Sequence, residues 1–147
     1  MKKIIVPVLI LALCSFTPSP HSENSSKGKI VVTFENLSEI KGYVEVSLYK
    51  KKKFLKKNGA IMTKRVPVKD KTVKVVFPEV PHGTYAITSF HDLNNNDKVD
   101  RNLLGIPREP VAVSKMKQKV LRKPKFNEAK LNFNKPEMVL ELQFMEY

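Results

Sequence analysis

The sequence predicts an all-β protein, a Greek-key β-sandwich of about seven strands of the immunoglobulin-like or prealbumin-like kind. Apolar and polar residues alternate over several short segments, as in strands with one buried face. Proline, glycine and asparagine, which favour turns, separate these segments. No stretch shows the sustained apolar period of an amphipathic helix. Short alternating strands separated by turns are typical of sandwiches and barrels.

The alternation places the strands along the chain. Four are expected before a central polar segment, at residues 30–34, 44–49, 73–77 and 85–91. Three more are expected after it, at residues 111–113, 130–133 and 140–144. Residues 61–68 are ambiguous, because Pro67 lacks an N–H group and argues against a central strand. Residues 78–83 are expected to form the turn between the third and fourth strands.

The N-terminus predicts export to the periplasm or the extracellular space. Lys2 and Lys3 precede an apolar run over residues 4–13, which is too short to cross a bilayer as a helix. No transmembrane helix is therefore expected in the mature protein. The chain divides into a signal peptide, a flexible leader and one β-sandwich domain, expected at residues 1–14, 15–27 and 28–147.

Two processing routes fit the end of the predicted signal peptide. Ala12 and Cys14 have the small size that a signal-peptidase site requires. Alternatively, residues 11–14 form an imperfect lipobox, and Cys14 then carries a lipid that anchors the protein to a membrane. Cys14 is the only cysteine, so the mature domain is expected to lack a disulfide, a cysteine metal cluster and a thiol nucleophile.

The chain is strongly basic, with 27 Lys and Arg residues against 14 Asp and Glu residues. Six of the lysines form a run: Lys50, Lys51, Lys52, Lys53, Lys56 and Lys57. One interpretation is that this run attracts an anionic envelope surface, such as lipid headgroups or an acidic polymer. The other is that it is a solvated loop or a lysine-protected edge strand. Nucleic acid is not an expected partner, because the chain is exported and no aromatic stacking platform accompanies the lysines.

The polar segment after the fourth strand carries the most informative spacing. Oxygen-bearing side chains recur at Asp92, Asn94, Asn96 and Asp100, which are positions one, three, five and nine of a calcium loop. The backbone carbonyl of Lys98 falls at position seven. Calcium prefers six to eight oxygen ligands, and a curled loop points alternate side chains at one centre. The spacing therefore predicts a structural calcium ion, bound with weak affinity.

The loop departs from the calcium pattern at two positions. Position six holds Asp97 where glycine is usual, and position twelve holds Leu103 where a bidentate glutamate is usual. Glu109 is the nearby acidic replacement, and it reaches the site if Gly105 and Pro107 turn the chain back. The alternative is an Asn/Asp-rich connection whose side chains cap their own backbone without a metal.

Three motifs in this order resemble a known family. They are Pro81-His82-Gly83-Thr84-Tyr85-Ala86, then His91-Asp92 with the loop to Asp100, then Gly105-Ile106-Pro107-Arg108-Glu109. Together they resemble the bacterial exported domain-of-unknown-function family numbered 2141. The resemblance implies a sandwich similar to prealbumin-like or carboxypeptidase regulatory-like modules, and export. It implies no activity, since none is established for the family.

Gly83, Tyr85 and His91 are expected to have structural roles, as are Gly105 and Pro107 in the turn. Tyr85 follows a Pro-x-Gly turn, so its hydroxyl can bond the turn backbone as a tyrosine corner, or the ring can simply fill the core. His91 is expected to orient the neighbouring carboxylate or its backbone rather than to catalyse.

The predicted function is a non-enzymatic exported module that binds a surface, a protein partner or a small anionic ligand. The first alternative is docking on an anionic envelope surface through the lysine run. The second is a metal-dependent hydrolase that uses His91 with Asp92, Asp100 or Glu109. It is disfavoured because only one histidine lies near the loop, and calcium-type ligands are poor at generating hydroxide near neutral pH.

Overall fold

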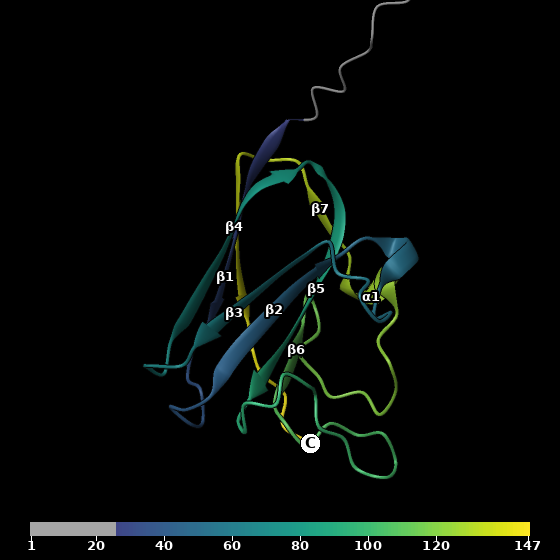
Figure 1. Cartoon of the computed structure of the whole chain (residues 1–147). Coiled ribbons are helices and arrows are strands. Elements are labelled where there is room, and N and C mark those ends of the chain that lie inside the picture. Colours follow the sequence, from purple (N-terminus) through teal and green to yellow (C-terminus); the bar gives the residue numbers. More distant parts are fainter. Residues whose placement is uncertain (1–25) are drawn as a thin grey trace, which may run out of the picture.

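A computed structural model describes residues 26–147, which form two packed β-sheets (Figure 1). The predicted signal peptide, with Cys14, lies outside the described residues, and so does the leader as far as residue 25. The first strand begins at Lys27, one residue before the expected start of the domain. Among the described residues, no helix has the length and apolar character needed to cross a membrane.

One sheet has three strands, in the order β4 (Val73–Pro81), β1 (Lys27–Phe34) and β8 (Glu137–Leu142). The central strand β1 is antiparallel to β4 and parallel to β8. The second sheet has the order β3 (Met62–Pro67), β2 (Tyr43–Tyr49), β5 (Gly83–Asp92) and β6 (Val111–Val113). Strand β7 (Leu131–Phe133) pairs with the beginning of β5. These two packed sheets confirm the predicted all-β sandwich.

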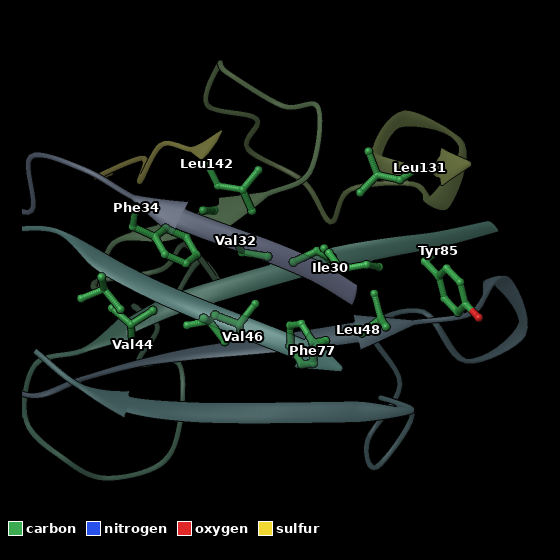
Figure 2. Packing of buried hydrophobic residues seen from close by; sticks show 14 of the residues in the cluster. Ile30, Val32, Phe34, Val44, Val46, Leu48, Phe77, Tyr85, Leu131 and Leu142 are labelled. Carbon is green, nitrogen blue, oxygen red and sulfur yellow. The ribbon is translucent and has the colours of Figure 1, made fainter. Parts of the chain in front are cut away.

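The core lies between the two sheets, and the predicted alternation accounts for it (Figure 2). On β1, Ile30, Val32 and Phe34 are fully buried, and on β2 the same holds for Val44, Val46 and Leu48. Strand β4 contributes Val75 and Phe77. Because successive side chains of a strand point to opposite faces, every second residue enters the core.

The predicted turn over residues 78–83 is wrong, because β4 continues to Pro81 and only His82 separates it from β5. The register between β1 and β4 shifts between Gly28 and Ile30, which is a β-bulge. Pro78 and Glu79 lie opposite this shift, and Glu79 has a φ of 52°. A bulge leaves a residue unpaired, so a proline without an N–H group is tolerated within the strand.

The ambiguous segment is β3, and its place at the edge of the sheet is where Pro67 is acceptable. The last strand lies earlier than predicted, since β8 ends at Leu142. Phe144 then stacks on Phe34 at a ring distance of 4.7 Å, and Met145 pairs with Val111 of the other sheet. Two single turns of helix were not predicted: η1 (Lys51–Lys53) and α1 (Phe126–Ala129). They are too short to show a helical period.

Candidate functional site

The predicted calcium loop begins at the end of β5 with Asp92, whose side chain is fully buried. Its Oδ1 accepts a hydrogen bond from the Asn96 N–H at 3.1 Å, and its Oδ2 accepts one from the Asp97 N–H at 3.0 Å. Asn95 and Asp97 both have a φ of 60°. Asp97 thus adopts the left-handed conformation that position six of a calcium loop requires, in place of glycine. The Asp92 carboxylate holds the first half of the loop in a tight curl.

Arg65, on the edge strand β3, supplies a cation to this half of the loop. Its Nη2 donates to Asp92 Oδ2 at 2.8 Å and to Asn95 Oδ1 at 2.6 Å. Its Nε lies 2.9 Å from Asp97 Oδ1 as an ion pair without hydrogen-bond geometry. The guanidinium also lies over the Tyr43 ring, 3.7 Å from its centroid. One protein side chain therefore contacts three loop oxygens, much as a bound cation would.

The charge state of Asp92 follows from these contacts. Burial alone would raise the pKa of its carboxyl group, because a buried charge loses hydration. Hydrogen bonds from Arg65 and from the N–H groups of Asp97 and Asn96 outweigh burial, so the pKa lies below its ordinary value. The same hydrogen bond to Asp92 raises the pKa of Arg65. The pair is ionised at neutral pH.

The outer half of the loop brings three predicted ligands together. Asn94 Nδ2 donates to Asp100 Oδ2 at 2.6 Å, and Asn96 Nδ2 lies 3.0 and 3.1 Å from the two Asp100 oxygens. The Oδ1 of Asn96 accepts the Lys98 N–H at 2.9 Å. Asn94 and Asn96 are exposed to solvent, whereas Asp100 is half-buried. The predicted side chains at positions three, five and nine thus converge on one point.

Glu109 returns to the loop, as the sequence suggested it could. Gly105 turns the chain with a φ of 77°, and Arg101 pairs with Pro107 across the turn. The buried Glu109 carboxylate then accepts the Leu93 N–H at 3.0 Å and the Asp100 N–H at 3.1 Å. Both ends of the loop are therefore held by one side chain.

The two halves of the loop differ in whether their oxygen atoms are free to bind calcium. Within residues 26–147, no group of three or more His, Cys, Asp or Glu side chains could hold a metal. Asp92 Oδ2 already accepts two hydrogen bonds, which engage both of its lone pairs. Asp100, Asn94 and Asn96 remain as candidate ligands, with amide nitrogens turned toward the carboxylate. Half-turn rotations of the two exposed amides would present oxygen atoms instead.

Tyr85, Gly83 and His91, for which structural roles were predicted, have defined contacts. The Tyr85 hydroxyl donates to the Pro81 carbonyl at 2.7 Å, while its ring is fully buried, so it serves as both corner and core. The same ring lies 3.4 Å from where a side chain at Gly83 would begin. His91 is buried, and its Nε2 donates to the Lys41 carbonyl at 2.7 Å. It thus orients the segment before β2 and not the Asp92 carboxylate.

Sequence reasoning missed Arg65, Tyr43 and Gly42. Gly42 has a φ of 68°, and a side chain there would begin 2.0 Å from the Asp92 carbonyl oxygen. Arg65 lies in the ambiguous segment, and only strand register brings it to the loop, since β2 pairs with both β3 and β5. A lone cation in an edge strand gives no signal by itself.

The lysine run forms the exposed turn η1 and the residues around it, not an edge strand. No ion pair of these six lysines occurs within the described part of the chain. The Lys50 ammonium lies 6.0 Å from the centroid of the Tyr85 ring. The run is therefore a solvated cationic turn, and its first lysine lies near the ring of Tyr85.

Comparison with known proteins gives one result. A family described as an uncharacterized protein conserved in bacteria, DUF2141, matches residues 32–141. No curated protein and no solved structure matches the chain. The matched residues extend from β1 to β8 and include the calcium-type loop, the Gly105–Pro107 turn and Glu109. Since the match covers most of the sequence, the chain belongs to the DUF2141 family of bacterial proteins.

Proposed function

We propose that this protein is a non-enzymatic, exported β-sandwich module whose Asp92–Asp100 loop binds one calcium ion weakly. The observation that carries the proposal is the convergence of Asn94 and Asn96 on Asp100, with Asp97 in the left-handed conformation at position six. The buried His91, whose ring bonds the Lys41 carbonyl, supports a structural rather than a catalytic role for this end of the sheet.

The proposed ion lies at the outer half of the loop. Asp100 supplies the carboxylate, and rotated amides of Asn94 and Asn96 supply further oxygens, with water completing the shell. Arg65 already pairs with Asp92, so Asp100 is the one carboxylate among the proposed ligands of the ion. A small ligand charge predicts the weak affinity of extracellular modules, with a Kd on the order of 10⁻⁴ to 10⁻³ M.

Calorimetric titration and thermal unfolding in calcium test the proposal. At about ten times the Kd, binding to the folded state alone stabilises it by about 1.4 kcal/mol, so the unfolding temperature should rise by several degrees. Asp100→Asn should abolish the rise. Asp70→Asn, at an exposed aspartate of another loop, is the matched control and should retain it. Absence of both heat and a thermal shift at millimolar calcium would contradict the proposal.

A second candidate is docking on an anionic surface through the lysine run. Its support is that Lys51, Lys52 and Lys53 lie exposed on η1 without ion pairs to the described residues. Sedimentation with anionic and neutral vesicles, at low and high salt, tests it with a Lys51→Glu/Lys52→Glu variant. Equal recovery of the wild type with both kinds of vesicle would end this candidate.

A further inference from the structure

Three leucines are almost fully exposed to water on one side of the molecule. The exposed fractions are 106% for Leu103, 84% for Leu104 and 80% for Leu121. The first two form the tip of the loop between β5 and β6, and the third lies between β6 and α1. Figure 1 shows both connections on the right-hand side of the molecule, below α1. Leucines this exposed contribute nothing to the core.

An apolar groove joins the two connections. Leu104 and Leu121 both line a cavity of about 510 Å³, together with Met116, Val120 and Met145. Leu104 and Leu121 therefore continue into an apolar floor and do not stand as isolated side chains, and Leu103 adjoins Leu104 in the chain. Contiguous exposed apolar surface of this kind marks a site of interaction with a membrane or another macromolecule.

The charged side chains that line this groove are all cationic: Arg101, Arg122 and Lys123. The basic segment, residues 115–125, contains six Lys and Arg residues and no acidic residue. Arg122 pairs with Glu128 at 2.6 Å. The other five, all lysines, make no ion pair with any residue from 26 to 147. Exposed cations beside exposed leucines complement a surface that offers both anions and an apolar interior.

We infer that this face docks on an anionic lipid bilayer. The leucine tips enter the boundary between headgroups and acyl chains, and the lysines of the basic segment lie against the anionic headgroups. A bilayer fits better than a protein partner, because the leucines lie on two separate connections and the charged side chains that line the groove are all cationic. The docking face does not require an ion in the Asp92–Asp100 loop. Leu55, between Lys53 and Lys56, also lines the groove, so the lysine run adjoins this face, but the proposed contact is made by the leucines and the basic segment.

Tryptophan fluorescence tests the inference, because the chain contains no tryptophan. Leu103→Trp places a sole reporter at the proposed tip, and Val139→Trp places one on exposed β8 as the matched control, since Val139 is 66% exposed. With vesicles containing phosphatidylglycerol, in the presence of a calcium chelator, the emission of Leu103→Trp should move to shorter wavelength. Brominated acyl chains should quench it. Val139→Trp should change in neither respect.

The full chain is used for every variant, so the N-terminal segment contributes equally to vesicle binding in all of them. Differences between the two spectra therefore report the surroundings of the tryptophan alone. An unmoved Leu103→Trp spectrum would overturn the inference and leave a protein contact as the reason for the exposed leucines. Equal shifts at the two positions, or an equal response to phosphatidylcholine vesicles, would overturn it as well. The chelator keeps this outcome separate from that of the calcium proposal.

Charge reversal locates the contact. In the Leu103→Trp background, Lys117→Glu/Lys119→Glu should require at least about thirtyfold more anionic lipid for half of the spectral shift, because each lysine near the surface contributes about 1 kcal/mol. Lys51→Glu/Lys52→Glu changes the net charge by the same amount and should require much less additional lipid. If the second variant is the more impaired, docking occurs through the lysine run and the inference for residues 103–125 is wrong.

Discussion

The two connections that flank β6 differ in where their charged side chains lie: the first buries carboxylates, and the second exposes lysines. Between β5 and β6, Asp92 and Glu109 are buried, and their oxygens accept N–H groups of their own loop or of Arg65. After β6, the basic segment leaves five lysines without ion pairs in the described chain. A buried carboxylate must be hydrogen-bonded, whereas an exposed ammonium is hydrated by water. The first connection is thus organised internally, and the second presents its charge to the outside.

The largest effect on stability is expected from Asp92→Ala. The substitution removes the acceptor for the Asn96 and Asp97 N–H groups and leaves Arg65 without its buried partner. We expect the free energy of unfolding to fall by about 3 kcal/mol, as measured by urea denaturation. Asp97→Ala is the control, because that carboxylate is 71% exposed, and it should cost less than about 1 kcal/mol. Similar losses of unfolding free energy in both variants would show that the Asp92 carboxylate does not hold the loop in its conformation.

Arg65→Met should have the next largest effect, about 2 kcal/mol. Methionine keeps an apolar stem beside Tyr43 but cannot pair with Asp92, which is then buried with only its two backbone donors. Denaturation curves measure the loss, and Lys64→Met on the same strand serves as the control. If calcium restores the stability of Arg65→Met but not that of Asp92→Ala, the ion can replace the guanidinium at Asp92.

Acid should remove the contribution of Asp92 selectively. Its pKa in the folded protein lies below the ordinary carboxyl value of about 3.9, so the stabilisation is fully present above that pH. It is lost as the pH falls through the lower, folded-state pKa, because protonation then breaks the pairing with Arg65. The difference in unfolding free energy between wild type and Asp92→Ala should therefore stay constant from pH 7 to pH 5 and narrow below pH 4. A difference that widens in acid would mean that the pKa of Asp92 is raised in the folded protein and not lowered.

Local sequence patterns predicted those parts of the molecule that depend on neighbouring residues. Alternation identified β1, β2 and β4, because burial of one face in the core imposes a period of two on each strand. The same local spacing predicted a curled loop, and the turn residues Gly105 and Pro107 left open a return of Glu109, which the structure has. It could not reveal Arg65, because the contact with Asp92 depends on the pairing of β3, β2 and β5, which the sequence leaves open. It also could not show that the leucines at 103 and 104 lie in water.

The smallest effect on stability is expected in the basic segment, and it sharpens the contrast between the two connections. Lys117→Ala/Lys119→Ala removes two exposed charges that have no ion pair in the described chain, so the free energy of unfolding should change by less than about 0.5 kcal/mol. Urea denaturation at low salt is the strictest measurement, because repulsion among the lysines is then least screened. A small gain in stability is also consistent, since removing like charges relieves that repulsion. A loss above 1 kcal/mol would mean that these lysines support the fold, and that the second connection is organised internally like the first.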